Sequence, residues 1–575
     1  AGDTVPFLLK QQKLAVADEA LNLVRFAGNL VLASFFTENN DNKRKAKRDD
    51  LLLQLSEYLR TGNIALRPSK VEQELRAGDK GITPFHWEIE FPEVFGRENG
   101  GFDAFVGNPP FVGGRRTSTL LGESYSAWLT SHFEEASNNA DLVAFFFRRV
   151  FELVRTDGCL GLIATNTIAQ GDSRSTGLRW ICTHGGVIYS ARKRMKWPGE
   201  AAVIVSLLHV SKGDSVRSRE LDGQPVPFIS AYLFHTGGHE NPLQLRAYDA
   251  FSFQGCILLG MGFTFDDKNS DASPIEEMNR LIAKNKHNSQ RIYPYIGGEE
   301  VNNSPTHSHH RYAIDFFDMS LEEASQWPDL IEIVRVKVKP ERERQKREAL
   351  RTRWWHYADK RPALRHALSS IDRVLVINCG ATPHMAFTFL SSRIIAANTL
   401  VLVAIPTQSA FCVLQSRVHE VWARFFASSM KDDLRYTNSD CFETFPFPVA
   451  FETDSMLELA GKDYFEFRAA LMIKNEEGLT KTYNRFHDPN ETSADIKILR
   501  EFHAAMDRAV LNAYSWADLQ PSCEFLLDYE DDDEEDAEGE SGGGRRKKKP
   551  WRYRWPDEFR DEGLARLLEL NKKRA

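Results

Sequence analysis

The sequence predicts an α/β fold in which a partial Rossmann-like sheet is followed by an α+β domain and a helical C-terminal region. Three observations predict it. An apolar run at Phe102–Val106 ends abruptly in Asn-Pro-Pro-Phe. An amphipathic helix pattern at 141–158 leads into a β-branched apolar run at 159–168, and residues 187–210 have the pattern of two strands around a turn. Strand, helix, strand, helix and hairpin make up one half of a doubly wound sheet.

Length and composition indicate a globular protein of several domains. A chain of 575 residues is too long for one hydrophobic core, and its length predicts three or four domains. We expect no membrane span, because no run of about 18 apolar residues and no basic-then-apolar leader occurs. The seven cysteines are scattered without a CxxC pair, which argues against a metal site or a disulfide framework and favours the cytoplasm. Because the first residue is Ala1, we expect a piece of a longer protein.

The net charge of -8 does not exclude a nucleic-acid partner. Ten acidic residues are concentrated between Asp528 and Glu540, and without them the balance becomes +2. The body of the protein is therefore not acidic, and the distribution of charge matters more than its sum.

Periodicity and composition divide the chain into seven segments. Residues 1–95 have helical patterns, which we interpret as packing helices within about 13–59, and residues 96–213 contain the predicted sheet. A connecting region at 214–290 leads to a domain of short strands at 291–450 and a helical region at 451–520. Residues 521–549 have the acidic and basic composition of a disordered linker, and residues 550–575 form a helix with leucines available for docking.

The stretch "FDAFVGNPPF" places a rigid loop at the end of a strand. Two prolines fix φ and remove two backbone donors, so the strand has to stop at Asn108. The side chains of Asn108 and Phe111 are then held at the strand's carboxyl end, which is where ligands bind in α/β sheets.

This loop suits chemistry on the amino group of a nucleic-acid base. Such an amino group is a poor nucleophile, because its lone pair is delocalised into the ring. The side-chain oxygen of Asn108 and the carbonyl of Pro109 offer two neutral acceptors for its hydrogens. The base must first leave the helix at a cost of a few kcal/mol. Stacking on Phe111, worth about 1 to 3 kcal/mol per base, offsets much of that cost.

The same residues resemble motif IV of the amino-group DNA methyltransferases, in the N6-adenine class. "HWEIEFPEVFGRENGGFDAFVGNPPF" and "DGCLGLIATNTI" are similar to the large adenine methyltransferases of type IIG restriction-modification and of the BREX and DISARM phage-defence systems. The resemblance implies a site-specific enzyme that transfers a methyl group from S-adenosylmethionine to the N6 amino group of a flipped adenine in double-stranded DNA. Other phage-defence subunits are possible partners.

The resemblance also implies roles for individual residues. Asn108 and Pro109 would hold the amino group, Pro110 would keep the loop rigid, and Phe111 would stack on the flipped base. Trp197 in the hairpin would close the other side of the base. Two structural alternatives remain: Asn108 as a turn residue before the prolines, and Trp197 as a packing residue of the hairpin.

Downstream segments resemble a target-recognition domain, which makes residues 291–450 that domain. "PYIGGEEVNN", "RWWHYADKRPALRHAL", "VLQSRVHEVWARFF", "LRYTNSDCFETFPFP" and "RWPDEFRDEGLARLLELN" are its recurring segments, and the resemblance runs from about Lys13 to Asn571. The NPP tripeptide also occurs in methyltransferases of RNA and of protein glutamine, but this long recognition region disfavours them.

Candidate DNA contacts lie in the basic stretch 335–365, where arginine and lysine alternate with aromatic residues. They are Arg351, Arg353, Trp354, Trp355 and Lys360. The alternative is a solvated helix face, because glutamates are interspersed. "RIYPYIGGEEVNN" and "INCGATPH" are further loops that can reach base edges.

The sequence before the NPPF motif lacks the motif that normally binds the cofactor in such methyltransferases. Residues 1–107 contain no Gly-rich turn that follows a strand and opens a helix, so we assign no cofactor-binding residue. We expect a C-terminal part of a methyltransferase whose cofactor-binding half is a separate chain or was removed.

Two other functions stay open. The chain can be the methylase and specificity part of a fused restriction endonuclease, although "WPDLIEIVRVKVK" lacks the acidic residue of a nuclease site. It can also be a non-catalytic DNA-recognition subunit that keeps NPPF only as part of the fold.

Overall fold

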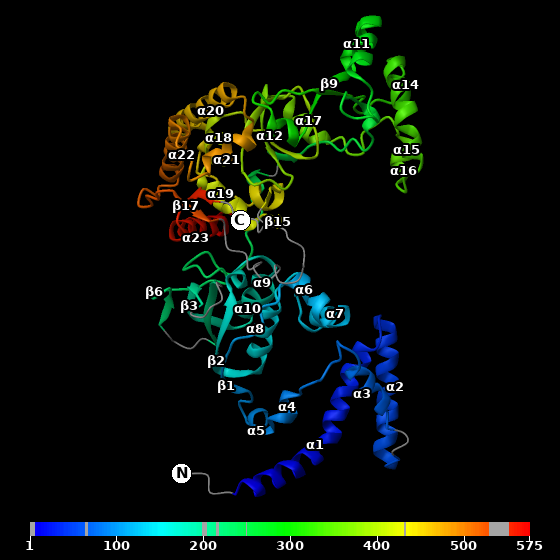
Figure 1. Ribbon diagram of the computed structural model, residues 1–575, viewed down its shortest axis with the longest axis vertical. Coiled ribbons are helices and arrows are strands. Elements are labelled where there is room, and N and C mark those ends of the chain that lie inside the picture. The colour runs from blue at the N-terminus through cyan, green and yellow to red at the C-terminus, as the bar shows by residue number, and fades with distance from the viewer. Residues whose placement is uncertain are drawn as a thin grey trace. The chain divides into compact units, whose positions relative to one another are not determined.

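The computed structural model describes residues 6–63, 67–197, 204–213, 218–248, 250–430, 433–527 and 551–575. These residues form two compact units, the first up to residue 240 and the second from residue 241 onward (Figure 1). Within the described ranges, no helix combines the length and apolarity needed to cross a lipid bilayer.

The first unit consists of ten α-helices and six strands in its described part. The helices are α1 (Phe7–Phe36), α2 (Asp41–Thr61), α3 (Ser69–Arg76), α4 (Trp87–Glu90), α5 (Pro92–Phe95), α6 (Gly114–Leu121), α7 (Glu123–His132), α8 (Leu142–Leu153), α9 (Gly171–Arg174) and α10 (Trp180–Thr183). The strands are β1 (Phe102–Gly107), β2 (Val154–Thr165), β3 (Gly186–Lys196), β4 (Ile204–Lys212), β5 (Arg219–Leu221) and β6 (Gln224–Val226).

The six strands form one mixed sheet in the order β1-β2-β4-β3-β5-β6. β1 and β2 are parallel, whereas β4 is antiparallel to both β2 and β3. The chain directions of β1, β2 and β3 therefore agree, and their carboxyl ends share one edge of the sheet. The structure confirms the α/β class and adds β5 and β6, which the sequence did not predict.

Helices cover one face of this sheet. Val143, Phe147 and Phe151 of α8 are buried against Leu160 and Leu162 of β2. On the opposite face Ala104 and Val106 of β1 are exposed, with Val106 at 90%. Ile163 and Leu207, which pair across β2 and β4, are only half-buried. Among the described residues, this second face is thus less completely buried than the first, whereas doubly wound sheets are usually covered on both faces.

The helix before β2 is shorter than predicted. It ends at Leu153 and not at Gly158, because Val154 already belongs to β2 and pairs with Phe102 of β1. Gly158 lies within β2. A side chain there would lie 2.9 Å from the carbonyl oxygen of Asp103, so glycine permits the close approach of β1.

The second unit contains thirteen α-helices and twelve strands among the described residues. The helices are α11 (Ile275–Lys284), α12 (Gly298–Asn303), α13 (Leu321–Ala324), α14 (Pro328–Lys337), α15 (Lys339–Glu343), α16 (Glu348–Thr352), α17 (Pro362–Leu368), α18 (Gln408–Gln415), α19 (Arg417–Phe426), α20 (Ser455–Asn475), α21 (Leu479–Phe486), α22 (Ala494–Ala513) and α23 (Asp557–Arg574). The strands are β7 (Ser252–Gln254), β8 (Thr264–Phe265), β9 (Ile292–Ile296), β10 (Arg311–Ile314), β11 (Arg373–Asn378), β12 (Thr388–Ser391), β13 (Ile395–Ala396), β14 (Leu400–Val403), β15 (Ser428–Met430), β16 (Asp433–Arg435), β17 (Glu524–Leu527) and β18 (Trp551–Arg554).

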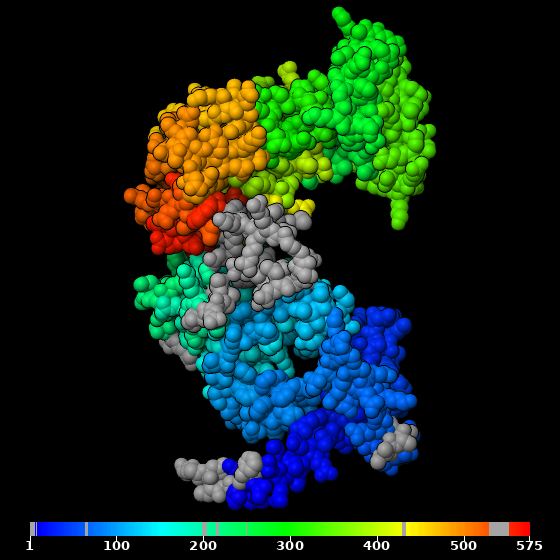
Figure 2. Space-filling model, viewed as in Figure 1, coloured from blue at the N-terminus to red at the C-terminus, as the bar shows by residue number. Residues whose placement is uncertain are grey.

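Two four-stranded sheets dominate the middle of this unit, in the orders β13-β9-β10-β8 and β12-β11-β14-β7. β7 belongs to the second sheet although it lies in the predicted connecting region. The helices α18, α20 and α22 follow as a packed group, and Figure 2 shows the red C-terminal segment beside orange residues of this unit. α23 contacts α19, and its Leu564, Leu567 and Leu568 are buried.

The expected disordered linker is partly ordered. Residues 528–549 lie outside the described ranges, but Glu524–Leu527 forms β17 and pairs with β18. Composition alone could not predict this pairing, because the partner strand follows more than twenty residues later.

Candidate active site

The NPPF loop, residues 108–111, begins directly after β1, at the carboxyl edge of the sheet. Asn108 and Pro110 are exposed, whereas Pro109 is buried and Phe111 is half-buried against the apolar core. The loop therefore presents an amide side chain to solvent from an anchored backbone. This placement agrees with the prediction from the proline pair.

Asp141 anchors the chain immediately after the NPPF loop. Its carboxylate caps α8 by accepting the N–H of Val143 at 3.0 Å, and it also accepts the N–H of Val112 at 3.2 Å. The N–H of Leu142 in turn donates to the carbonyl of Val112 at 2.9 Å. Burial raises the pKa of Asp141 above its ordinary value, and the two N–H bonds act against that rise.

A second bond links this anchor to α9. The N–H of Asp141 donates to the hydroxyl of Ser173 at 2.9 Å. Asp141 thereby joins the NPPF loop, α8 and α9. Sequence reasoning missed this role, although an Asp directly before an apolar helix is a recognisable cap signal.

Trp197 lies at the same sheet edge as the NPPF loop but not beside it. It follows Lys196, the last residue of β3, and is half-buried. β2 and β4 lie between β3 and β1, which separates β3 from β1 by about 14 Å at the usual strand spacing. The register places Gly107 level with Ala191, so Trp197 lies further from the loop than this spacing alone. The turn that continues from Trp197, including Pro198 and Gly199, is outside the described residues.

The predicted DNA-contact residues of the second unit have different environments. Arg351 and Arg353 are exposed, and the guanidinium of Arg351 donates to the carbonyls of Gln345 and Lys346, each at 2.8 Å. Trp355 is half-buried and its indole N–H donates to the carbonyl of Met319 at 2.9 Å.

Two of the predicted contacts need correction or qualification. Trp354 is only 6% exposed and belongs to the hydrophobic core, so its ring is not available to DNA. Lys360 forms an ion pair with Asp318, which neutralises its charge locally. Arg342 in the same stretch is fully buried and donates to the carbonyl of Leu258 at 2.5 Å. This structural role could not be recognised from the basic composition of the stretch.

The two loops expected to reach base edges lie side by side. The N–H of Gly298 donates to the hydroxyl of Thr399 at 3.0 Å, and a side chain at Gly298 would lie 2.6 Å from the amide of Asn378. Glycine is therefore required where the two loops meet. Asn378 is half-buried and Thr399 is exposed, which places polar groups at one end of both sheets.

A buried ion pair holds the first of these loops. Glu300 accepts two bonds from the guanidinium of Arg311, at 2.6 and 3.0 Å, and one from the N–H of Gly297 at 2.9 Å. Burial disfavours the charge of Glu300, but these donors outweigh it and lower the pKa of that carboxyl. The start of α12 is thus fixed in position.

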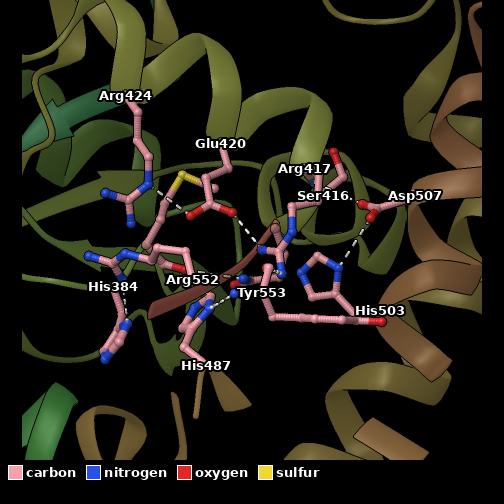
Figure 3. A network of polar contacts seen from close by, with 12 residues as sticks. His384, Ser416, Arg417, Glu420, Arg424, His487, His503, Asp507, Arg552 and Tyr553 are labelled. Atoms are coloured by element: carbon pink, nitrogen blue, oxygen red, sulfur yellow. Dashed lines mark hydrogen bonds and ion pairs between the residues drawn. The ribbon is translucent and has the colours of Figure 1, made fainter. Parts of the chain in front are cut away.

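A larger buried network joins the C-terminal segment to the second unit (Figure 3). Glu420 pairs with Arg417 at 2.5 Å and with Arg424 at 2.9 Å. The second guanidinium nitrogen of Arg417 donates to the carbonyl of Tyr553 at 2.5 Å. Arg552 contacts the ring of His384 at 3.0 Å.

The histidines of this network are buried as neutral groups. The N–H of Tyr553 donates to the ring of His487 at 3.0 Å, and His487 stacks on His384 with ring centres 5.2 Å apart. Burial lowers the pKa of His384 to about 3 and that of His487 well below its usual range. Because every member bonds to a neighbouring segment, we interpret the network as the anchor of β18 and α23.

Comparisons with known proteins match both units. Residues 14–183 match the Eco57I restriction-modification methylase model, and residues 261–449 match the model of the MmeI target recognition domain. A curated relative, DNA methyltransferase A of Bacillus subtilis (strain 168), is 22% identical over 445 residues, which are 74% of this chain and 47% of the relative. The chain thus spans about half the length of that protein.

Solved structures give more distant matches. The type IIL restriction-modification enzyme MmeI in complex with DNA is 18% identical, with a TM-score of 0.48, over 88% of this chain and 63% of that one. The type IIG restriction endonuclease BpuSI is 12% identical, with a TM-score of 0.29, over 72% and 55%. From the two matching family models, the chain combines a domain of the Eco57I restriction-modification methylase family with a target-recognition domain of the MmeI family.

Proposed function

We propose that this chain provides the catalytic loop and the target-recognition part of a DNA methyltransferase that modifies the N6 amino group of adenine. The observation that carries the proposal is the NPPF loop, which the buried Asp141 anchors at the carboxyl edge of the sheet. The loop lies inside the segment that matches the methylase family. A bacterial restriction-modification or phage-defence system is the setting that this family indicates.

In this proposal the chain holds the acceptor nitrogen. The side-chain oxygen of Asn108 and the carbonyl of Pro109 accept the two amino hydrogens, which favours a more tetrahedral nitrogen with a localised lone pair. Phe111 stacks on the extruded base, and its core contacts keep the ring in place. No carboxylate is needed at the nitrogen, since its proton can leave after the methyl group has arrived.

S-adenosylmethionine is the proposed methyl donor, and it would supply an electrophilic methyl group. The described residues before β1 do not fit it by themselves. β1 is the first strand of the described chain, so no Gly-rich turn between a strand and a helix precedes it. We therefore assign no residue of this chain to the donor.

The open edge of β1 supports a donor site completed from elsewhere. Among the described strands only β2 pairs with β1, and Val106 is 90% exposed on the uncovered face. An unpaired apolar edge is unfavourable in solution and ready to pair with another strand. We propose that a segment outside residues 1–575, of the same protein or of a partner chain, adds a strand beside β1 and brings the cofactor loop.

Calorimetry tests this division. Residues 1–575 should bind S-adenosylmethionine weakly or not at all, and the longest natural polypeptide that contains them should bind it. Tight binding by residues 1–575 alone would overturn the divided site while leaving the proposed reaction intact.

Methylation of DNA in cells tests the proposed reaction. The longest natural polypeptide is expressed in a host without N6-adenine methylation, and genomic DNA is analysed for modified bases and their sequence context. We expect N6-methyladenine at one recurrent sequence. Unmodified DNA from cells with folded protein would favour a non-catalytic recognition subunit, and cleaved DNA would favour a fused endonuclease.

A further inference from the structure

The last two residues of the first unit, His239 and Glu240, are held by side chains of that unit. The guanidinium of Arg174, which is 2% exposed, donates to the carbonyl of His239 at 2.7 Å. The hydroxyl of Tyr232 donates to the carbonyl of Glu240 at 3.2 Å, and the carboxylate of Glu240 pairs with Arg179 at 3.2 Å. The backbone is thus fixed up to the boundary of the unit at residue 240.

Asn571 of α23 holds the chain where the second unit begins. Its side-chain oxygen accepts the N–H of Leu243 at 2.9 Å. Its side-chain nitrogen donates to the carbonyl of Leu243 at 2.8 Å and to that of Thr444 at 2.7 Å. Asn571 is 2% exposed, whereas Leu243 is 57% exposed. The amide of Asn571, rather than apolar burial, therefore holds Leu243, and we call its two bonds to Leu243 the Asn571 clamp.

Two residues, Asn241 and Pro242, connect these held ends, and we call them the joint. Proline fixes its own φ and disfavours helical backbone at the residue before it, so the joint is short and stiff. Without the Asn571 clamp, the next described residue with a bonded backbone is Leu245, which is buried and donates its N–H to the carbonyl of Glu443 at 2.8 Å. The joint would then contain four residues in place of two and gain about 7 Å of reach.

The short helix α9 connects the joint to the NPPF loop within the first unit. Its Ser173 accepts the N–H of Asp141, the residue that anchors the chain after the loop. The neighbouring Arg174 holds the carbonyl of His239, two residues before the joint. One helix thus contacts both the anchor of the loop and the residues that lead into the joint. Any change in the length of the joint therefore acts on a chain that is held on both sides.

We propose that Asn571 is a positioning residue for methyl transfer. By holding Leu243 it keeps the joint two residues long, which limits where the recognition unit can present a target adenine to the NPPF loop. The inference rests on the proposed function and gives a role to the C-terminal segment "RWPDEFRDEGLARLLELN", whose last residue is Asn571. A tethered group meets its site at an effective concentration that falls with about the −3/2 power of tether length. Doubling the joint should therefore lower kcat at least threefold and leave the KM for DNA nearly unchanged.

Distances between the two units test the Asn571 clamp. Nitroxide labels are attached through p-acetylphenylalanine at the exposed positions Glu152 of α8 and Asp463 of α20, in the longest natural polypeptide that contains residues 1–575. Pulsed electron paramagnetic resonance should give one narrow distance distribution for the wild type. The distribution should broaden in Asn571→Ala and in a variant with Gly-Ser inserted between Asn241 and Pro242, which also makes the joint four residues long. An unchanged width in Asn571→Ala, or a wild type as broad as the insertion variant, would overturn the inference.

Asn288→Ala is the matched control for loss of a buried amide. Asn288 is fully buried in the second unit and donates to the carbonyl of Leu281 at 2.9 Å and to the carboxylate of Asp329 at 3.1 Å. Its replacement should lower the midpoint of thermal unfolding without broadening the distance distribution or changing kcat. Equal broadening in Asn288→Ala and Asn571→Ala would show a general loss of stability and contradict a specific role of Asn571 at the joint.

Steady-state methylation of DNA by the same polypeptides tests the effect on the reaction. Asn571→Ala and the insertion variant should lower kcat by similar factors, with the KM for DNA within twofold of the wild type. Wild-type kcat in Asn571→Ala would overturn the positioning role, even if the wild type methylates DNA as proposed. A wild type that has a narrow distance distribution but methylates no DNA would instead overturn the proposed function, and the role in methyl transfer with it.

Discussion

The carboxylate of Asp141 accepts the backbone N–H of Val112, 3.2 Å away, and thereby fixes the residue that follows Phe111. Asp141 and Val112 lie far from each other in sequence. The same carboxylate caps α8 by accepting the N–H of Val143. We expect Asp141 to be a positioning residue that acts on the NPPF loop without touching the substrate.

Replacing Asp141 should therefore affect catalysis and stability together. Loss of a cap of this kind costs about 0.5 to 2 kcal/mol, so Asp141→Ala should lower the midpoint of thermal unfolding. It should reduce kcat more than the KM for DNA, since the recognition unit is untouched. Asp141→Asn keeps one acceptor oxygen and should retain most of the activity. Equal kcat in wild type and Asp141→Ala would contradict the positioning role.

Phe111 should act through its aromatic face. Phe111→Leu removes stacking worth about 1 to 3 kcal/mol, which predicts a decrease of kcat/KM of roughly 5- to 150-fold. Phe111→Tyr preserves the ring and should stay close to wild type. Steady-state methylation of a DNA substrate measures both. A leucine variant as active as the tyrosine variant would assign the ring to core packing alone.

Arg351 and Arg353 should contribute to DNA binding without selecting a sequence. Both are exposed on the second unit, in the stretch that follows α15. The variant Arg351→Ala, Arg353→Ala should weaken binding to target and non-target duplexes by the same factor. If only the target duplex were affected, these arginines would read bases and the phosphate assignment would be wrong. The double variant Glu341→Gln, Glu343→Gln, in the same region, is the control that reports the effect of local charge on DNA binding.

The buried network around Glu420 should be sensitive to loss of one partner. Glu420→Gln leaves the nearby guanidinium groups of Arg417 and Arg424 without their carboxylate. Breaking a buried pair in this way costs about 3 to 5 kcal/mol. Chemical denaturation should detect this loss. Glu466→Gln serves as the control, because its pair with Lys462 is 3.9 Å long and exposed, and a change above about 1 kcal/mol there would be unexpected.

Acid should destabilise the second unit through its buried histidines. Burial lowers the pKa of His384 and of His419 to about 3, whereas an unfolded histidine titrates near 6.5. Between these pH values each histidine takes up a proton on unfolding. Its contribution to the free energy of unfolding is therefore fully present above about pH 6.5 and is lost as the pH decreases towards 3.

The slope of stability against pH measures this effect. Each histidine contributes about 1.4 kcal/mol per pH unit within the window. His419→Gln should reduce the slope between pH 4 and 6 by that amount. His366→Gln, at an exposed position, controls for the loss of an imidazole. A slope unaffected by His419→Gln would show that this ring is not buried as a neutral base.

The sequence allowed the position of the NPPF loop to be predicted for a local reason. Two prolines after an apolar run can only end a strand, and the next strand and the hairpin were visible from their β-branched residues. The hydrogen bond by which Asp141 anchors Val112 could not be predicted in the same way, because it joins residues 29 positions apart.

The recognition region shows the other limit of prediction. Trp354 and Trp355 are neighbours of the same type, yet one is buried in the core and the other is half-buried. Arg342 and Arg351 share one basic stretch, yet Arg342 is buried and Arg351 is exposed. Composition identifies such a stretch as basic and aromatic, but only the packing of α14–α16 decides which side chains face outward.

Transfer of a labelled methyl group tests the central claim most directly. The longest natural polypeptide containing residues 1–575 is incubated with S-[methyl-³H]adenosylmethionine and DNA, and the DNA is digested to nucleosides. We predict label in N6-methyldeoxyadenosine, with a loss of about 10²-fold or more in Asn108→Ala and no loss in the exposed control Asn490→Ala. Label in N4-methyldeoxycytidine, or equal transfer by wild type and Asn108→Ala, would contradict the account.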